Sequence, residues 1–217
     1  VSKKLLNDLI SGLRPTDLFN VILFAGGNSL MAESSLPANA ENIQKAIDHI
    51  SNQHGGGGTN LLPALKQSLL LPENVEGISR SIVVVTDGYI GIEPEAFDLV
   101  RQNLNKANLY AFGIGSSVNR HLIEGLAYAG QGIPAIILNA GEAPQAAAKF
   151  RQYIANPVFT QITSTFSGFD AYDIEPVSIP DVLSERPVVL FGKWRGKPQG
   201  HIYLSGYDKD YLCVKQD

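Results

Sequence analysis

The part of this sequence that most constrains its fold is an apolar run at residues 82–86, Ile-Val-Val-Val-Thr, which leads into Asp87 and Gly88. The run has the length of a strand, and it lacks the alternation of polar residues that a half-exposed strand shows. Such continuous apolar runs are typical of parallel sheets that are covered on both faces. In open parallel sheets, ligands bind just beyond the carboxyl ends of the strands. Asp87 is therefore predicted to lie where such a sheet binds its ligands.

A glycine-rich segment precedes this run. Residues 55–58 are four glycines, and Thr59 and Asn60 follow them at the start of a helix-like apolar pattern. A segment so rich in glycine does not hold a regular element, so Thr59 is expected at a loop tip. The hydroxyl of Thr59 and the carboxylate of Asp87 are hard oxygen donors, the ligands that Mg²⁺ and Ca²⁺ prefer. The two segments together suggest a site for a divalent cation.

Strand-like and helix-like segments alternate through the first 155 residues or so. Strands are predicted at residues 19–24, 29–33, 82–86, 109–112 and 135–138, and helices at residues 1–13, 40–50, 60–71, 94–104, 119–128 and 142–155. This alternation is the pattern of an α/β fold whose parallel sheet is covered by helices on both faces. Residues 19–24 have almost no polar side, so we expect them to form a central strand.

The character of the chain changes after Pro157. Short β-like segments at residues 158–166, 187–191, 201–204 and 211–214 follow one another without a helix, and the second and third are expected to form a hairpin. We therefore predict two domains, residues 1–156 and residues 157–217, the second an antiparallel β module. A module this small is not expected to be stable alone. It is expected to pack against the α/β body through apolar contacts, or to complete a sheet with sequence outside these residues.

Composition agrees with a folded chain and excludes some functions. Apolar residues make up 44% and charged residues 18% of the 217 residues, and the net charge of −4 argues against a nucleic-acid-binding surface. No apolar stretch approaches the length of a membrane span. Cys213 is the single cysteine, which excludes an internal disulfide but does not distinguish a cytoplasmic from an exported protein.

The order of these motifs resembles a known family. Residues 14–21 (Arg-Pro-Thr-Asp-Leu-Phe-Asn-Val), the glycine-rich loop with Thr59, residues 84–88 (Val-Val-Thr-Asp-Gly) and residues 112–115 (Phe-Gly-Ile-Gly) are similar to the von Willebrand factor type A domain of inter-α-trypsin inhibitor heavy chains and their bacterial relatives. The resemblance covers nearly the whole chain. It implies a Rossmann-like, doubly wound, mostly parallel sheet, and in that family a VIT domain usually precedes the type A domain.

The resemblance also implies a role for five residues. Thr59 and Asp87 are the expected ligands of a metal-ion-dependent adhesion site, with Asp87 bound to the ion directly or through water. Gly58, Asn60 and Gly88 are expected to shape the loops around the ion. The ion is expected to be Mg²⁺ or Ca²⁺, and an acidic side chain of a partner protein is expected to fill its open position. These expectations describe a non-enzymatic adhesion or assembly module that is extracellular, on the cell surface or periplasmic.

The remainder of that site is an Asp-x-Ser-x-Ser loop, which this sequence lacks and which we expect to precede Val1. In the family, the strand that carries this loop lies between the strands predicted here at residues 19–24 and 82–86. These two strands are therefore expected not to pair with each other. A direct ladder between residues 21–23 and 83–85 would favour a different topology.

Alternative interpretations exist for each motif. Asp-Gly after a strand is also a common turn, and the glycine-rich loop lacks the Lys-Ser/Thr that a phosphate-binding loop requires. Ser116 and Ser117 are expected to cap a helix and not to act as nucleophiles. The functional alternative is a Mg²⁺-dependent hydrolase or phosphoryl-transfer enzyme that uses Asp87 and Thr59. No convergent acid, base or nucleophile set supports that alternative in the remaining loops.

Overall fold

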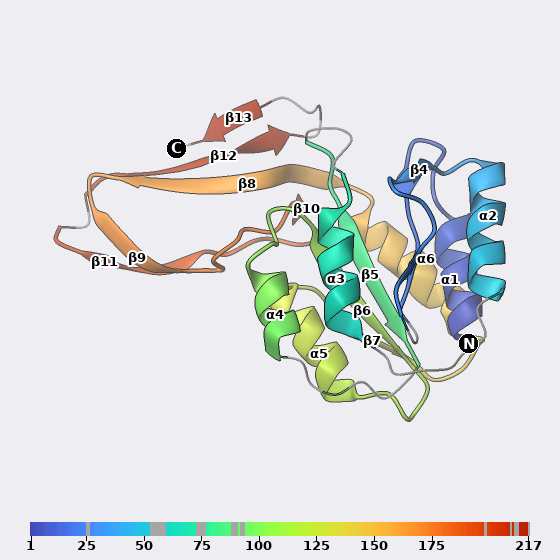
Figure 1. The fold of residues 1–217 in the computed structure, drawn as a ribbon. Helices are drawn as coiled ribbons and strands as arrows, with labels where there is room; N and C mark the ends of the chain where they lie inside the picture. Colours follow the sequence, from blue (N-terminus) through green and yellow to red (C-terminus); the bar gives the residue numbers. More distant parts are fainter. Residues whose placement is uncertain are drawn as a thin grey trace.

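The computed structural model describes residues 1–24, 27–52, 60–72, 77–87, 91, 94–197, 199–208, 210 and 213–216. An α/β body occupies the N-terminal part of the chain, and two long β layers extend from one end of it (Figure 1). We call the second part, residues 157–217, the β extension. The division into two domains at this boundary stays a prediction.

A parallel sheet lies at the centre of the body. Its order is β5 (Ser81–Thr86), β6 (Asn108–Ile114) and β7 (Ala135–Ile137), and each pair of neighbours is parallel. Every residue of β6 is buried. Its side chains alternate between two clusters, with Leu109 and Ala111 in one and Tyr110 and Phe112 in the other. This alternation shows that both faces of the sheet are covered, as the α/β prediction requires.

Helices cover the two faces of this sheet (Figure 1). One face packs against α3 (Leu61–Leu70), α4 (Pro94–Arg101) and α5 (Arg120–Ala129), and the other packs against α1 (Ser2–Ser11) and α6 (Ala143–Ile154). A further helix, α2 (Ala40–Ser51), packs against α1. The predicted doubly wound architecture is therefore confirmed.

The segment predicted as one central strand at residues 19–24 is divided in two. The first pair is β1 (Leu18–Phe19) with β4 (Leu36–Pro37), and the second is β2 (Ile22–Leu23) with β3 (Ser29–Leu30), both antiparallel. Asn20 lies between the two short strands. Its side chain accepts a hydrogen bond from the backbone N–H of Val21 at 2.9 Å and donates to the carbonyl of Ala32 at 2.7 Å. The prediction of a single strand was wrong because this asparagine competes for the backbone groups of the run.

The edge of β5 that faces away from β6 has no strand partner among the described residues. β2 pairs with β3 and β5 pairs with β6, so no ladder joins residues 21–23 to residues 83–85. This arrangement agrees with the type A topology expected from the sequence. Val83 and Val85 are only partly buried, in contrast to the residues of β6. The apolar run at residues 82–86 is therefore less covered than its composition predicts.

The β extension contains two separate antiparallel sheets. The larger sheet has the order β10 (Val182–Leu183), β8 (Pro157–Ser167), β12 (His201–Asp208) and β13 (Cys213–Gln216), and the smaller sheet pairs β9 (Asp170–Glu175) with β11 (Phe191–Arg195). The predicted hairpin between residues 187–191 and 201–204 is therefore wrong. Gly200 explains the exchange of sheets, since a Cβ there would collide with the carbonyl oxygen of Ser167. Only glycine allows the chain to cross so close to β8.

A buried polar cluster joins the extension to the body. Asp181 of the extension accepts hydrogen bonds from the Ser79 hydroxyl at 2.6 Å, the Asn108 amide at 2.7 Å and the backbone N–H of Gln161 at 3.2 Å. The Arg186 guanidinium in turn donates to the side-chain oxygen of Asn108 and to the carbonyl of Asp181. Asn108 therefore bridges a buried carboxylate and a buried guanidinium. The sequence predicted apolar contacts between the extension and the body, and it did not predict these buried polar ones.

Further contacts of the junction lie at the same end of the parallel sheet. The Ser178 hydroxyl donates to the side-chain oxygen of Asn105 at 2.7 Å and accepts from its backbone N–H at 2.8 Å. The Thr160 hydroxyl donates to the carbonyl of Gly77 at 2.7 Å. Gly77 precedes β5 and Asn105 precedes β6, so the extension is attached at the amino ends of the parallel strands. Their carboxyl ends lie at the opposite edge.

Burial favours the neutral form of the Asp181 carboxyl at the junction. Loss of hydration on burial raises the pKa of the Asp181 carboxyl above its ordinary value of 3.8, although hydrogen bonds from Ser79, Asn108 and Gln161 and the charge of Arg186 act in the opposite direction. A carboxyl whose pKa is higher in the folded than in the unfolded chain binds protons more tightly in the folded chain. Its contribution to stability is complete below the unfolded pKa and is lost as pH rises through the folded pKa.

The pH dependence of unfolding tests this assignment. We expect the free energy of unfolding of the wild-type chain to increase, relative to that of an Asp181→Asn variant, as pH falls from about 7 to about 4. The amide that replaces the carboxyl does not titrate, so the difference between the two chains isolates the carboxyl. Urea unfolding at several pH values gives both curves. A wild-type chain that loses stability relative to the variant on acidification contradicts a raised pKa.

The buried guanidinium gives a second test. Arg186→Met removes the cation and leaves the Asp181 carboxylate without a compensating charge, so we expect the free energy of unfolding at pH 7 to fall by about 3 kcal/mol or more. Lys149→Met is the control, because Lys149 is exposed on α6 and its replacement is expected to cost at most about 0.5 kcal/mol. Equal urea midpoints for the two variants would show that the junction does not depend on Arg186.

Candidate metal centre

The carboxyl edge of the parallel sheet is where the sequence places the candidate ligands. Asp87 directly follows β5, and its side chain is exposed. Asn60 directly precedes α3, which packs on the sheet and returns the chain toward the start of β5 (Figure 1). Thr59, Gly58 and Gly88 lie outside the described residues. The structure therefore locates Asp87 and Asn60 of the five predicted site residues.

A hydroxyl that the sequence did not predict contacts Asp87. The Ser2 hydroxyl, at the start of α1, donates a hydrogen bond to one carboxylate oxygen of Asp87 at 2.6 Å. The contact joins residues 85 positions apart in the chain. A local sequence pattern does not reveal such a pair. The one available signal was that α1 and β5 are both expected to have an end at the carboxyl edge of the sheet.

Asn60 differs from the other asparagines at helix starts in this chain. Asn39 caps α2 by accepting from the N–H of Asn42 at 2.9 Å, and Asn119 caps α5 by accepting from the N–H of Leu122 at 3.3 Å. Asn60 occupies the same position at α3, yet its side chain makes no capping hydrogen bond. Its oxygen is therefore not used by the helix that it precedes, which is compatible with the predicted role beside the metal loop.

The loop after β6 at the same edge is built differently from the prediction. Ser116 and Ser117 were expected to cap the following helix, but Asn119 provides the cap. Both serines are exposed. The prediction was wrong because Asn119, and not a serine, directly precedes the first residue of α5, Arg120. Asparagine is also at least as good an N-cap as serine.

The chemistry of the described donors fits part of a divalent-cation site. Asp87 supplies one carboxylate and Ser2 supplies one hydroxyl, both hard oxygen donors of the kind that Mg²⁺ and Ca²⁺ prefer. Within the described ranges, no three or more His, Cys, Asp and Glu side chains form a group that could hold an ion. Mg²⁺ takes about six oxygen ligands, several of which are usually water. These residues therefore provide an incomplete coordination shell.

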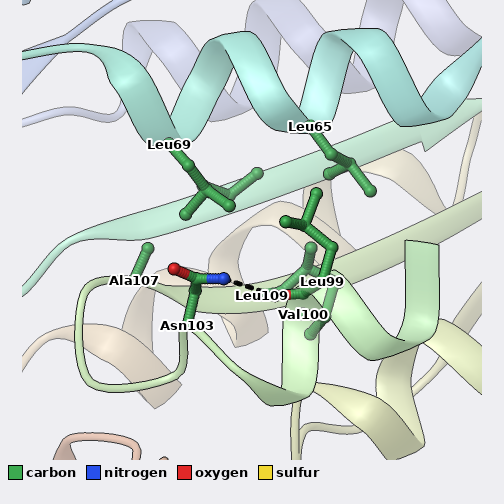
Figure 2. A pocket seen from close by; sticks show the side chains of 8 residues that line it. Leu65, Leu69, Leu99, Val100, Asn103, Ala107 and Leu109 are labelled. Atoms are coloured by element: carbon green, nitrogen blue, oxygen red, sulfur yellow. Dashed lines mark hydrogen bonds between the residues drawn. The ribbon is translucent and has the colours of Figure 1, made fainter. Parts of the chain in front are cut away.

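A small apolar cavity lies in another part of the body (Figure 2). Its volume is about 10 Å³, and residues of α3, α4, β5, β6 and the connection between α4 and β6 line it: Leu65, Leu69, Ile82, Leu99, Val100, Asn103, Ala107 and Leu109. The amide of Asn103 is directed to the carbonyl of Leu99, with a distance of 2.8 Å. A cavity of this size holds about one water at most, and an apolar lining disfavours even that. It is a packing defect and not a ligand site.

Comparisons with known proteins agree with the fold. The family model of the von Willebrand factor type A domain matches residues 1–136. A von Willebrand factor A domain-containing protein of Dictyostelium discoideum is 24% identical over 94% of this chain, and von Willebrand factor A domain-containing protein 5B1 of Mus musculus is 30% identical over 71%. Inter-alpha-trypsin inhibitor heavy chain H3 of Bos taurus is 24% identical over 88%. The chain spans 22%, 13% and 23% of the lengths of these three relatives.

Solved structures show the same fold. A von Willebrand factor type A protein from Catenulispora acidiphila matches 99% of this chain with a TM-score of 0.67 and 14% identity, and 60% of that protein is covered. The ArnB paralog VWA2 from Sulfolobus acidocaldarius matches 99% with a TM-score of 0.61 and 17% identity, and 58% is covered. Proximal thread matrix protein 1 from mussel byssus, whose metal-ion-dependent adhesion site is occupied by zinc, matches 77% with a TM-score of 0.50 and 16% identity, and 44% is covered.

Domains of this type commonly act as protein-interaction modules, and a divalent metal occupies the site of at least the mussel protein. The matched family model, the doubly wound sheet and the oxygen donors at its carboxyl edge lead to one assignment. The chain belongs to the von Willebrand factor type A domain family.

Proposed function

We propose that this chain is the core of a non-enzymatic, metal-dependent protein-binding module. The observation that carries the proposal is the exposed carboxylate of Asp87 at the carboxyl edge of the sheet, in contact with the Ser2 hydroxyl. Asp87 and Thr59 are the proposed ligands, and Gly58, Asn60 and Gly88 shape the two loops. The bound ion supplies a positive charge with an open position for an acidic side chain of the partner.

The proposed ion is Mg²⁺ or Ca²⁺. A site built from carboxylate and hydroxyl oxygens suits these hard cations better than it suits a soft metal. Zinc occupies the metal-ion-dependent adhesion site of the mussel protein, so a protein of this fold can hold a divalent ion there. The few anionic donors at this edge leave the bound ion electron-poor. An acidic side chain from outside then adds a favourable ligand without a competing internal carboxylate.

The placement of the β extension supports a partner at this edge. The extension is attached through Asp181 and Asn108 at the amino ends of the parallel strands, whereas Asp87 follows the carboxyl end of β5. The attachment therefore lies away from the carboxyl edge. A protein ligand that approaches along the strand direction reaches Asp87 without displacing the junction.

Two observations support binding over catalysis. A ladder between residues 21–23 and 83–85 would have contradicted the type A topology and favoured the enzyme alternative, and the described strands do not form one. The described residues also contain no group of three or more His, Cys, Asp and Glu side chains that could hold an ion. Catalysis of hydrolysis or phosphoryl transfer requires such convergent groups.

The proposed location is extracellular, on the cell surface or periplasmic. Similar proteins include inter-alpha-trypsin inhibitor heavy chains and an aerotolerance-related membrane protein from Bacteroides fragilis. Across the described ranges, the structure contains no helix with the length and hydropathy needed to span a bilayer.

Residues 1–217 alone are expected to bind divalent metal weakly. Asp87, Thr59 and Ser2 supply at most three donor side chains, whereas Mg²⁺ takes about six ligands and Ca²⁺ about six to eight. Isothermal titration with Mg²⁺ and Mn²⁺ measures this directly, and Asp87→Ala is expected to remove the little heat that remains. Tight stoichiometric binding to residues 1–217 would show that the site is complete without an Asp-x-Ser-x-Ser loop.

A longer chain that contains the expected Asp-x-Ser-x-Ser loop tests the function itself. With that loop present, Mn²⁺ is expected to bind, and Thr59→Ala and Asp87→Ala are each expected to abolish the binding. Acetate, which mimics the partner's side chain, is expected to displace water from the bound Mn²⁺ and to lower the water-proton relaxation rate.

Two controls make this experiment specific. Acetamide has the shape of acetate without its charge and is expected to leave the relaxation rate unchanged. Asp98→Ala removes an exposed carboxylate on α4 that pairs with Arg101 at 2.6 Å, and it is expected to bind Mn²⁺ as the wild-type chain does. Equal effects of acetate and acetamide would contradict an open position for a carboxylate.

A further inference from the structure

The carboxylate of Asp87 is bound at one of its two oxygens only. Ser2 Oγ donates to Asp87 Oδ2 at 2.6 Å, and among the described residues Oδ1 accepts no hydrogen bond and faces no cation within ion-pair distance. A distance of 2.6 Å is typical of a hydroxyl that donates to an ionised carboxylate, and such bonds are stronger than those between neutral groups. The two oxygens of Asp87 therefore differ in what they offer to an ion.

The packing of α1 fixes the position of Ser2. Leu5, three residues later and so on a neighbouring part of the same helix side, is fully buried in the apolar cluster on one face of the parallel sheet. The N–H of Leu5 donates to the carbonyl of Val1 at 3.0 Å, which closes the first turn of the helix. The start of α1 lies at the same end of the body as the carboxyl end of β5 (Figure 1). The hydroxyl is therefore presented to Asp87 by a packed helix.

The two lysines that follow Ser2 are bound to other groups. Lys3 Nζ donates to the carbonyl of Ser51 at 3.0 Å, and Lys4 pairs at 3.4 Å with an aspartate one turn later on α1. The partner of Asp87 is thus a neutral hydroxyl, which does not cancel the charge of the carboxylate as an ammonium group would. Such a donor orients a ligand and leaves its charge available to a cation.

Mg²⁺ and Ca²⁺ make different use of a carboxylate. Mg²⁺ demands near-ideal octahedral geometry with about six ligands at about 2.0–2.1 Å, and the two oxygens of one carboxylate lie too close together to fill two octahedral positions well. Ca²⁺ takes about six to eight oxygens at about 2.3–2.6 Å in a flexible arrangement, and it binds carboxylates through one oxygen or both. The second oxygen of a carboxylate is therefore useful to Ca²⁺ and of little use to Mg²⁺.

We propose that Ser2 is a specificity-determining residue of the metal site and makes this site select Mg²⁺ over Ca²⁺. The hydroxyl occupies Oδ2 and leaves Asp87 one oxygen, Oδ1, for an ion. One oxygen is sufficient for Mg²⁺, whereas two-oxygen binding of Ca²⁺ first requires the Ser2 hydrogen bond to break. The inference rests on the proposed function and narrows it, since carboxylate and hydroxyl donors alone are compatible with both ions.

A direct bond from the Ser2 oxygen to the ion is the competing role of this hydroxyl. A hydroxyl ligand contributes to the binding of both ions, so its removal weakens both affinities and leaves their ratio nearly unchanged. A hydroxyl that acts through Asp87 changes the ratio instead. The ratio of the Kd for Ca²⁺ to the Kd for Mg²⁺ therefore distinguishes the two roles.

Isothermal titration of the longer chain with the Asp-x-Ser-x-Ser loop, with Mg²⁺ and with Ca²⁺, gives this ratio. Ser2→Ala is expected to lower the ratio by at least about fivefold, mainly through tighter binding of Ca²⁺, because no hydrogen bond then has to break. Ser2→Thr keeps a hydroxyl and is expected to retain the wild-type ratio. Ser117→Ala is the matched control, because Ser117 is an exposed serine in the loop after β6 at the same edge, and it is expected to change neither affinity.

The outcomes separate this inference from the proposed function. An unchanged ratio in Ser2→Ala, together with loss of both affinities in Asp87→Ala, overturns the inference and leaves the proposed function standing. Wild-type affinities in Asp87→Ala, or no binding of either ion to the longer chain, contradict both. In EDTA, the Tm of Ser2→Ala is expected to lie within about 2 °C of the wild-type value, which excludes a loss of fold as the cause of a changed ratio.

Discussion

Burial of β6 on both faces and along both edges is the constraint on which the rest of the structure depends. Leu109 and Ala111 pack toward α3, α4 and α5, while Tyr110 and Phe112 pack toward α1 and α6. Because the strand pairs in parallel with a neighbour on each side, its direction fixes the polarity of the whole sheet. Its first residue, Asn108, anchors the β extension, and the strand then runs toward the edge where Asp87 lies.

β5, the strand that Asp87 follows, has fewer strand partners than β6. Within the described part of the chain it has a ladder on one side only, and Val83 and Val85 are partly exposed although their side chains are as apolar as those of a buried strand. Buried backbone groups without partners cost about 1–3 kcal/mol each, so an unpaired edge weakens a sheet unless water or another strand satisfies it. Asp87 therefore follows the strand of this sheet whose second edge has no strand partner among the described residues.

The sequence predicted the elements whose signal is local. Residues 82–86 are a strand because a continuous apolar run has few other solutions in an α/β chain. Residues 19–24 were predicted wrongly as one strand, since Asn20 binds neighbouring backbone groups and this competition is not visible in hydrophobicity. The junction of Asn108 with Asp181 also had no local signal, because these residues are 73 positions apart and each alone is compatible with a turn.

The candidate site, too, could be predicted from the sequence only in part. The position of Asp87 follows from the strand before it, and its chemistry follows from the carboxylate. Its contact with Ser2 depends on how α1 packs beside β5, which is a property of the folded body. A site assembled at a sheet edge draws its donors from several loops, so each loop can be recognised in sequence while the set cannot. In this chain β6 runs from the edge where the extension is attached to the edge where Asp87 lies. Asp87 and Ser2 lie at one edge, and the β extension is attached through Asn108 and Asp181 at the other.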